Sequence, residues 1–408
     1  MAQEPFTVRW GILATGGIAT TFAKDLLTNP ATRSVNDVRH TIVAAASSSS
    51  ESRAVEFLKD VGAPTSAKAY GSYHALAQDP NIDVVYVATP HSHHFQNAML
   101  CLTAGKNVLC EKAFTVNAAQ ARLLVEKAKE KGVFLMEAVW TRYFPLSVKI
   151  RELVTSGKIG TVVKVNADLC INGSTDDAEK LSFSDKHRAV NMDLAGGALL
   201  DLGIYTLTWV FQILYLCQKA PADGSGKEKP KILAAIDKYH TGADALTSII
   251  CHWPKQRTMG IATSSWRVAT TPDGEGSPAA GPACRIQGTK GEIQVFGPLY
   301  RPTMYRVIMF GGERGVVEEV ECPIPKDPKI PGVKGEEELG WGHGMFWEAD
   351  EVARCLRDGK KQSDLLTWEE SIVIMDAMDE VRKQGDLVYP QEIESDVYDE
   401  KSPLNGSS

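Results

Sequence analysis

The 408-residue sequence lacks the features that mark several classes of protein. Its eight cysteines are widely spaced and include no Cys-x-x-Cys pair, so neither a zinc framework nor a secreted disulfide scaffold is expected. No run of Lys or Arg occurs, and 44 basic against 51 acidic residues give a formal net charge of −7. Such a charge is unfavourable for binding nucleic acid or an anionic membrane. We therefore expect no nucleic-acid partner, no membrane partner and no metal site.

The sequence also shows no pattern typical of export or membrane insertion. Residues 1–10 contain no basic stretch followed by an apolar one, so no signal peptide is expected. The most apolar long stretch, 198–217, is interrupted by polar residues that include Asp201 and Gln212. These interruptions favour a buried helix over a membrane span. Together with cysteines that we expect to be reduced, this pattern predicts a cytoplasmic location.

The amino-terminal part alternates between strand and helix patterns. Apolar runs typical of strands occupy 6–13, 41–46, 83–88 and 107–110, and helical patterns lie between them. Continuous apolar strands that alternate with helices indicate a parallel sheet covered on both faces. Residues 1–140 are therefore expected to form a doubly wound α/β domain that binds its ligand at the carboxyl ends of the strands.

The pattern changes after residue 140, where runs typical of strands dominate. These runs are 161–169, 232–239, 246–252, 258–264 and 291–296. Helical patterns lie near 197–217, 343–357 and 367–384. Segments rich in Pro, Gly and charge are expected to be surface loops, at 221–230, 271–282 and 325–342. We predict an α+β domain over 141–391, built on one largely antiparallel sheet, and an acidic surface tail over 392–408.

The first strand leads into a glycine-containing turn. It reads Gly11-Ile-Leu-Ala14-Thr15-Gly16-Gly17-Ile18 and opens a helix. Glycines at such a turn let the backbone approach a pyrophosphate, whose charge is stabilised by the helix N-terminus. Ala14 replaces the usual first glycine, and we expect it to adopt a backbone angle open to non-glycine residues. A plain strand-to-helix turn without a ligand is the alternative that this motif leaves open.

The end of the second predicted strand indicates which dinucleotide would bind. An NAD site normally has an acidic residue there to hold the ribose 2′-hydroxyl. This sequence instead has Ser47, Ser48 and two more serines, with Arg53 close behind. Hydroxyls and a guanidinium suit a 2′-phosphate, so we favour NADP over NAD. A serine that only caps the next helix is compatible with this interpretation.

A Glu111-Lys112 pair ends the fourth predicted strand. Most lysines lie on the solvated surface, but this one is expected at the carboxyl edge of a buried parallel sheet, where ligands bind. There a lysine can hold a substrate hydroxyl or lower the pKa of a neighbouring acid.

Three histidines follow the third predicted strand, in Thr89-Pro90-His91-Ser-His93-His94. Three histidines so close together could bind a metal ion, but no carboxylate or cysteine ligand lies at a suitable spacing in the sequence. We expect this segment instead to pack along the nicotinamide half of the cofactor and to begin a helix.

The apolar helix begins with Gly196-Gly-Ala-Leu-Leu-Asp201-Leu-Gly-Ile-Tyr205. Asp201 and Tyr205 are four residues apart and share a helix face. A buried carboxylate needs a partner or a polar cavity, and a nearby ammonium would make the phenol of Tyr205 a usable proton acceptor. A structural Asp beside an ordinary core tyrosine is the alternative.

Aromatic residues and arginines near the predicted domain junction can line a pocket. Trp140 and Arg142 are of this kind, as is Trp266 beside Arg267. Each of them can equally belong to the core, and the sequence does not distinguish the two.

Taken together, these motifs resemble the Gfo/Idh/MocA oxidoreductase family. The glycine turn, the Thr89 to His94 segment, Glu111-Lys112 and the Gly196 to Tyr205 segment occur in the family's order. Glu137-Ala-Val-Trp-Thr-Arg142 and Gly288-Thr-Lys-Gly291-Glu are similar to one branch. That branch holds dimeric dihydrodiol dehydrogenases and fungal NADP-dependent D-xylose 1-dehydrogenases, and the whole chain looks most like the fungal enzymes.

The resemblance implies an NADP-binding Rossmann domain followed by an open-faced sheet domain that forms a homodimer. It implies oxidation of D-xylose at C1 to D-xylono-1,5-lactone, a step of pentose catabolism, with Tyr205 as proton acceptor, Lys112 assisting it and Asp201 orienting the substrate. The expected cofactor-binding residues are Ala14, Thr15, Gly16, Gly17, Ile18, Ser47, Ser48, Arg53, Thr89, Pro90, His91, His94, Glu111, Lys112 and Arg142. The expected substrate-binding residues are Lys112, Trp140, Arg188, Asp201, Tyr205 and Trp266.

Three positions depart from the family pattern. Ala14 replaces a glycine, Ala113 replaces the proline that commonly follows Glu-Lys, and Tyr205 stands where many members have histidine. The dihydrodiol branch shares the tyrosine. We expect the first two departures to shift local backbone geometry without removing chemistry.

Three other functions are compatible with the same fold. One is oxidation of trans-dihydrodiols of aromatic hydrocarbons, and another is a non-enzymatic NADP-sensing regulator. Lys112 and Tyr205 argue against the regulator because a sensor needs neither. The third, a glucose–fructose-type oxidoreductase with permanently bound cofactor, is disfavoured by the expected lack of a signal peptide.

Overall fold

The computed structural model describes residues 4–177, 179–219, 226–274, 276–311, 316–332 and 337–406. The chain divides into two compact units. Unit 1 comprises 1–143, 324–371 and 392–408, and unit 2 comprises 144–323 and 372–391. Segment 324–371, which the sequence pattern assigned to the second domain, thus packs within unit 1. The predicted loop residues 221–225 and tail residues 407–408 lie outside the described residues.

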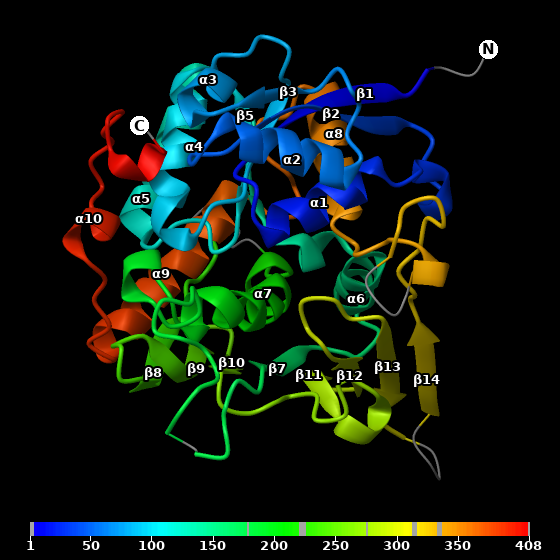
Figure 1. Cartoon of the computed structure of the whole chain (residues 1–408). Helices are drawn as coiled ribbons and strands as arrows, with labels where there is room; N and C mark the ends of the chain where they lie inside the picture. Colours follow the sequence, from blue (N-terminus) through cyan, green and yellow to red (C-terminus); the bar gives the residue numbers. More distant parts are fainter. Residues whose placement is uncertain are drawn as a thin grey trace. The chain divides into compact units, whose positions relative to one another are not determined.

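Unit 1 is built on a six-stranded parallel sheet with the order β3-β2-β1-β4-β5-β6 (Figure 1). Its strands are β1 Phe6–Leu13, β2 Val38–Ala46, β3 Lys68–Tyr70, β4 Val84–Val87, β5 Asn107–Glu111 and β6 Leu135–Ala138. Its helices are α1 Gly17–Leu27, α2 Glu51–Val61, α3 Tyr73–Ala77, α4 His94–Thr103, α5 Ala118–Lys131 and α8 Phe346–Arg357. This is the doubly wound order, so the predicted Rossmann domain is confirmed.

The central strands of this sheet follow directly from the sequence. Every residue of β4 is buried, as an apolar strand in a sheet with two covered faces should be. The sequence pattern missed β3 and β6, which have only three and four residues. Each of them includes a charged residue, Lys68 or Glu137, whereas the equally short β4 is apolar at every position.

A return segment from late in the chain covers part of unit 1. The carboxylate of Asp25, at the end of α1, accepts hydrogen bonds from Trp341 Nε1 at 2.7 Å and from the backbone N–H groups of His343 at 2.9 Å and Met345 at 2.6 Å. These bonds fix the chain just before α8. In Figure 1, α8 lies beside β2, although more than 290 residues separate them in sequence.

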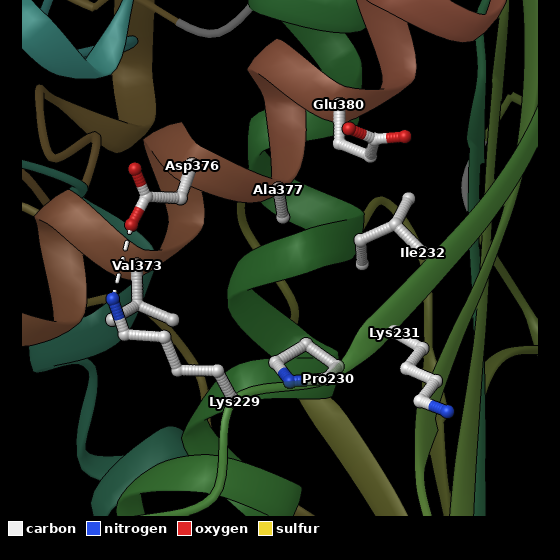
Figure 2. Close-up of a pocket in the computed structure, with 8 residues that line it drawn as sticks. All are labelled: Lys229, Pro230, Lys231, Ile232, Val373, Asp376, Ala377 and Glu380. Atoms are coloured by element: carbon white, nitrogen blue, oxygen red, sulfur yellow. Dashed lines mark hydrogen bonds and ion pairs between the residues drawn. The ribbon is translucent and has the colours of Figure 1, made fainter.

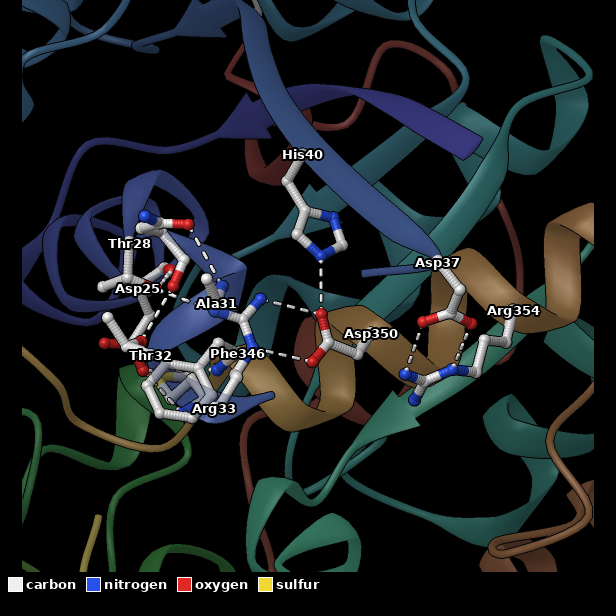
Figure 3. A network of polar contacts seen from close by, with 12 residues as sticks. Asp25, Thr28, Ala31, Thr32, Arg33, Asp37, His40, Phe346, Asp350 and Arg354 are labelled. Carbon is white, nitrogen blue, oxygen red and sulfur yellow. Dashed lines mark hydrogen bonds and ion pairs between the residues drawn. The ribbon is translucent and has the colours of Figure 1, made fainter. Parts of the chain in front are cut away.

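A buried ion-pair network joins α8 to the sheet (Figure 3). Asp350 on α8 accepts two 2.8 Å hydrogen bonds from Arg33 and one of 2.9 Å from His40 Nε2. Trp10 Nε1 donates to His40 Nδ1 at 3.1 Å, so the neutral ring with its proton on Nε2 satisfies both nitrogens. Burial lowers the pKa of His40, in agreement with a neutral ring.

Unit 2 is built on an eight-stranded sheet with the order β14-β13-β12-β11-β7-β10-β9-β8. Only the β7–β10 pair is parallel. The strands are β7 Val162–Cys170, β8 Lys231–Lys238, β9 Asp244–Trp253, β10 Thr258–Ser265, β11 Pro282–Gly288, β12 Gly291–Phe296, β13 Met304–Met309 and β14 Val316–Glu321. The helices are α6 Pro145–Thr155 and α7 Ile204–Phe211, and the helices α9 Trp368–Gln384 and α10 Gln391–Glu394 each have residues in both units. The predicted mostly antiparallel sheet is confirmed.

The two faces of this sheet differ in what covers them. One row of paired residues is buried, including Ile249, Ala262, Cys284 and Val295, and α7 packs on this face. The next row points the other way and reads Leu233, Ile250, Ile261, Asn166, Arg285, Gln294, Arg306 and Glu319 from β8 to β14. This second face, here called the open face, carries exposed Leu233 and Ile250 beside charged pairs.

The apolar helix of unit 2 is a core element. Within the described ranges, Met192–Leu216 is the stretch that has the length and hydropathy of a membrane span, and 94% of its most apolar window is buried inside the protein. The prediction of a buried helix over this stretch agrees with that burial.

Replacing Asp350 by alanine is expected to destabilise unit 1 by about 3–5 kcal/mol, because Arg33 would become a buried charge without its carboxylate. Both side chains are 1% exposed. The measurement is the urea midpoint of unfolding, followed by tryptophan fluorescence. Asp364→Ala is the control, since it breaks an exposed pair with Lys360 and should cost less than about 1 kcal/mol. Equal losses of stability in the two variants would show that the buried network stabilises unit 1 no more than an exposed ion pair does.

Candidate functional site

The start of α1 offers an open anion site at the carboxyl end of β1. Gly16 is the N-cap residue, no side chain caps the helix, and its first turn has no acidic residue. A Cβ atom placed on Gly16 or Gly17 would meet nothing within 4 Å. The unpaired N–H groups and helix dipole therefore face open space, which fits the pyrophosphate of a dinucleotide.

Ala14 differs from the expectation for this turn. Its φ is 84°, in the left-handed region that favours glycine. The expected angle open to non-glycine residues is therefore wrong. The strained residue is held by a hydrogen bond from its N–H to the carbonyl of Ala46 at 3.1 Å, which keeps the first two strand ends together despite a cost of roughly 1–2 kcal/mol.

The turn after β2 carries the hydroxyls predicted to meet a 2′-phosphate. Ser47 is buried and its Oγ lies 2.9 Å from Ser49 Oγ. Ser50 caps α2, because its hydroxyl accepts a hydrogen bond from the N–H of Arg53 at 3.3 Å. A helix-capping serine in this turn was compatible with the predicted phosphate site. The exposed guanidinium of Arg53 makes no hydrogen bond or ion pair with any residue that the structure describes. A guanidinium left open in this way suits a phosphate.

Glu111 and Lys112 lie at the carboxyl end of β5, where the sequence placed them. Glu111 is buried, accepts a hydrogen bond from the hydroxyl of Tyr86, and accepts another from the N–H of Lys112 at 3.1 Å. The Lys112–Ala113 peptide bond is cis. The main chain of Lys112 is thus fixed by the carboxylate beside it, and its side chain is partly exposed.

The histidine segment is largely buried. His94 Nδ1 lies 2.8 Å from the carbonyl of Ala113 and its Nε2 lies 2.9 Å from that of Thr89. Burial lowers the pKa of His94 to about 4, so the ring is neutral and donates to only one carbonyl at a time. His94 therefore joins the ends of β4 and β5, whereas its predicted contact with a cofactor stays a prediction. Within the described ranges, no three His, Cys, Asp or Glu side chains form a metal-binding group.

Arg142 and Trp140 have defined places in the interior of unit 1. The side chain of Arg142 is fully buried and its Nη2 donates to both oxygens of Glu370 at 2.6 Å. A buried guanidinium held by a carboxylate supports structure, so its predicted cofactor contact receives no support here. Trp140 is buried and stacks on His343, with ring centroids 5.0 Å apart.

A second group of predicted site residues lies within unit 2. Asp201 falls in a π-helical turn, Leu199–Gly203, that runs directly into α7, and Tyr205 is in the first turn of α7. Both are 5% exposed. Arg188 Nη1 lies 2.9 Å from Asp201 Oδ2, so the buried carboxylate has the cationic partner that its burial requires. The pair joins two of the predicted substrate-binding residues. π-Helical turns occur frequently at functional sites.

A residue that the sequence analysis missed fixes the start of this helix. The local N-cap residue, Ala198, has no side chain to cap the helix. Asp244, at the start of β9 and fully buried, supplies the cap: its Oδ2 accepts from the N–H of Leu199 at 2.6 Å and from Thr247 Oγ1 at 2.9 Å. Burial raises the pKa of Asp244 to about 6. No signal in the sequence links residues 198 and 244.

Two glycines make room for these contacts. Gly197 has a φ of 136°, and a Cβ there would overlap Asp244 Oδ1. A Cβ on Gly196 would lie 2.7 Å from the carbonyl of Arg188. The Gly196-Gly197 pair therefore lets both the cap and the Arg188 segment approach the helix that carries Asp201.

Trp266, the last predicted pocket residue, is buried in unit 2. Its ring makes an edge contact with Phe183, and the centroids are 5.5 Å apart. Its indole Nε1 has no hydrogen-bond partner within the described part of the chain. A buried tryptophan N–H normally finds a partner, so this one is available to an acceptor.

Glu348 on α8 is a second missed residue. Neither of its carboxyl oxygens has a hydrogen-bond partner among the described residues, and it is fully buried. Burial, with the nearby charge of Glu111, raises the pKa of Glu348 well above its ordinary value. A buried carboxyl group whose neutral form is favoured thus lies near Glu111.

A separate pocket of about 280 Å³ lies in unit 2 (Figure 2). It is lined by Lys229, Pro230, Lys231, Ile232, Val373, Asp376, Ala377 and Glu380. Lys229 Nζ lies 3.2 Å from Asp376 Oδ2 across its mouth. None of the predicted site residues lines it.

Comparisons with known proteins agree with this architecture. Residues 8–139 match the family described as "Oxidoreductase family, NAD-binding Rossmann fold", and residues 147–294 match the "GFO/IDH/MocA C-terminal domain". A D-xylose 1-dehydrogenase (NADP(+)) of Hypocrea jecorina is 59% identical over 402 residues, 98% of each chain. A trans-1,2-dihydrobenzene-1,2-diol dehydrogenase of Sus scrofa is 34% identical over 94% of this chain and 99% of its own.

Solved structures share the fold at low sequence identity. A 3-ketoreductase from Actinomadura kijaniata in complex with NADP and TDP-benzene superposes with a TM-score of 0.68 at 19% identity, over 93% of this chain and 98% of its own. An aldose-aldose oxidoreductase from Caulobacter crescentus gives a TM-score of 0.68 at 18% identity, with the same coverage.

Removing the distant cap is expected to destabilise unit 2. Asp244→Ala leaves the N–H of Leu199 and the hydroxyl of Thr247 buried without an acceptor, at a cost of about 2 kcal/mol in the free energy of unfolding. Asp244→Asn retains one acceptor oxygen and should recover part of the loss. Asp237→Ala, which removes the exposed carboxylate from a pair with the partly exposed Arg267, is the control. A loss in the control as large as in Asp244→Ala would contradict the capping role.

The same residue predicts a pH dependence. Because the folded pKa of Asp244, about 6, lies above the ordinary value of 3.8, its stabilising contribution is fully present below about pH 4 and is lost as pH rises through 6. The stability of the wild type relative to Asp244→Asn should therefore fall over this range in urea titrations. A constant difference would show that Asp244 does not titrate there.

Proposed function

The chain belongs to the Gfo/Idh/MocA oxidoreductase family, and from this premise we propose that it is an NADP-dependent D-xylose 1-dehydrogenase that forms D-xylono-1,5-lactone. The substrate assignment is based on the relative from Hypocrea jecorina, because the match covers nearly the whole length of both chains. We place the enzyme in the cytoplasm and in pentose catabolism.

The residues of unit 1 fit NADP at both ends of the dinucleotide. The uncapped start of α1 would take the pyrophosphate, with Ala14, Thr15 and Gly16 in the turn before it. The Ser47 to Ser50 turn and the open guanidinium of Arg53 would take the 2′-phosphate. NADP+ supplies the acceptor for the hydride that leaves C1 of the sugar.

The protein supplies the proton chemistry. Tyr205 accepts the proton of the C1 hydroxyl, which lets the C1–O bond become a carbonyl as the C1 hydrogen leaves with its electron pair. Lys112 hydrogen-bonds the same oxygen, and its positive charge favours the phenolate form of Tyr205. Tyr205 is buried and the main chain of Lys112 is fixed by a hydrogen bond, so few orientations are open to either residue. This restriction supports the two roles, because reacting groups must be held in a defined geometry.

Asp201 and Arg188 would bind the remaining sugar hydroxyls. The carboxylate of Asp201 would accept hydrogen bonds from hydroxyl groups, while the half-exposed guanidinium of Arg188 would donate them. The indole N–H of Trp266 offers a further donor. The capping by Asp244 makes it a positioning residue for Asp201.

We also propose a homodimer through the open face of unit 2. This face carries exposed apolar residues at Leu233, Ile250, Met259 and Val317. Eight strands at about 4.8 Å spacing give a surface broad enough for the roughly 800 Å² per partner of a stable interface. Exposed apolar residues on a surface of this size are typical of protein interfaces.

The first experiment is the formation of NADPH from NADP+ with D-xylose, beside NAD+, D-glucose and a trans-dihydrodiol. Rapid turnover confined to NADP+ and D-xylose is the expected result. Activity on the dihydrodiol alone would move the function to that of the 34%-identical relatives. Binding of NADPH without turnover of any substrate would favour a sensor.

Lys112→Ala is expected to lower kcat by ~10²-fold or more, the scale of a positioned proton-transfer group, and to leave NADPH binding largely intact. Steady-state kinetics and NADPH fluorescence titration measure the two effects. Lys131→Ala, an exposed lysine on α5, is the matched control. Near-normal turnover in Lys112→Ala would remove the residue from the mechanism.

Ile261→Lys should disrupt the dimer because it puts a charge near the middle of the open face. Light scattering after gel filtration should show the mass fall from twice the chain mass to 44.4 kDa. Val388→Lys, which alters an exposed residue outside the strands of this sheet, should leave the mass unchanged. A wild-type protein that is monomeric at micromolar concentration would exclude this interface.

A further inference from the structure

The last segment of the chain packs closely on unit 1. The sequence pattern predicted 392–408 as an acidic surface tail. In the structure, the described part runs past α5 and α4 (Figure 1). A single turn of helix at Pro403–Asn405 contacts both α4 and the turn His91–His93. The segment therefore reaches the region that we expect to lie along the cofactor.

Side-chain amides of α5 and of its N-cap residue hold the beginning of this segment. Gln120 Nε2 donates to the carbonyls of Ile393 at 2.7 Å and Ser395 at 2.8 Å. Asn117 Nδ2 donates to the carbonyl of Glu394 at 3.0 Å. All three acceptors are backbone carbonyls, so these bonds fix the path of the main chain whatever the side chains are.

Two amides of α4 hold the remainder. Gln96 Nε2 donates to the carbonyl of Val397 at 2.8 Å. Asn97 is fully buried, and its Nδ2 donates to the carbonyl of Leu404 at 2.8 Å and to Asn405 Oδ1 at 3.1 Å. Asn97 is thus the tether nearest the end of the described chain.

The segment ends against the turn after β2. Gly406 has a φ of 61°, and a Cβ placed on it would lie 2.5 Å from Ser48 Cβ and 3.1 Å from the ring of Tyr73. Ser48 interacts with Tyr73, whose pKa is raised by burial. The backbone of Gly406 therefore packs directly on a residue of the proposed 2′-phosphate site, and it has the space to do so only because it is glycine.

The acidic groups next to this contact are already engaged. Asp399 Oδ1 accepts from the N–H of Lys401 at 2.9 Å, and Glu400 Oε1 lies 3.5 Å from His74 Nδ1. The side chain of Arg53, which follows this turn in the sequence, makes no ion pair with the described residues. The local charge balance therefore leaves Arg53 to an incoming anion.

We propose that the carboxyl-terminal segment 399–406 is a positioning element of the cofactor site, which holds the Ser47 to Ser50 turn in the shape that accepts a 2′-phosphate. This inference rests on the proposed function, because it assumes that NADP is the cofactor. It assigns to the tail a role in the selection of NADP over NAD. The tail touches no reacting atom.

The test compares two nucleotides that differ only in the 2′-phosphate. Asn97→Ala removes the last tether, and Gly406→Leu forces the chain away from Ser48. In isothermal titration calorimetry, both variants should bind 2′,5′-ADP about tenfold more weakly than the wild type, equivalent to 1.4 kcal/mol. Binding of 5′-AMP should stay within about twofold, because the pyrophosphate end of the site is untouched.

Gln120→Ala is the matched control, since it removes a buried amide tether at the other end of the segment. It should leave both affinities unchanged. The proposal fails when Asn97→Ala and Gly406→Leu bind 2′,5′-ADP as the wild type does. It fails equally when either variant loses affinity for both nucleotides alike, or when Gln120→Ala matches their selective loss.

The wild-type protein separates this failure from failure of the proposed function. A wild type that does not prefer 2′,5′-ADP to 5′-AMP would contradict NADP as the cofactor itself. A wild type with that preference, and variants that keep it, would contradict only the role of the tail. Thermal unfolding checks that each variant is folded. If Asn97→Ala does not fold, Gly406→Leu alone decides the outcome.

Discussion

The carboxylate of Asp25 is the contact on which the arrangement of unit 1 depends. It accepts hydrogen bonds from the side chain of Trp341 and from the main-chain N–H groups of His343, Met345 and Phe346, at the start of α8. A fully buried carboxylate is costly, and burial raises the pKa of Asp25 to about 6 even with four donors around it. Those donors belong to a segment more than 300 residues away, so the first helix and the return segment stabilise each other or neither is stable.

Several features of the site region follow from this placement. Once α8 is held, Asp350 reaches Arg33 and His40, and Glu348 is buried near Glu111. His343 is brought against Trp140. In unit 2, Asp244 has a similar role, because its buried carboxylate fixes the start of the helix that carries Asp201 and Tyr205. In each unit, a buried carboxylate outside the proposed chemistry thus fixes a segment of the chain: the start of α8 in unit 1 and the start of the helix that carries Asp201 in unit 2.

The sequence predicted correctly those parts of the fold in which burial sets the pattern of apolar residues. The strand β4 is apolar at every position because both faces of its sheet are covered. The strands β13 and β14 were missed because one face is exposed, so that charged residues such as Arg306 and Glu319 interrupt the pattern. The ion pair of Arg142 could not be predicted, because its partner, Glu370, is 228 residues away and cannot be inferred from spacing.

The sequence by itself determined the chemistry that is available: a glycine turn opening a helix, serines and an arginine where an acid would suit NAD, a Glu-Lys pair at a strand end, and an Asp and Tyr on one helix face. Each is a local pattern, set by residues within a few positions of one another. Only the tertiary structure decided the left-handed angle of Ala14, the cap from Asp244, the Arg188–Asp201 pair and the contact of Gly406 with Ser48. These features depend on atoms that come from distant segments, and a buried polar group takes whichever partner the completed fold brings to it.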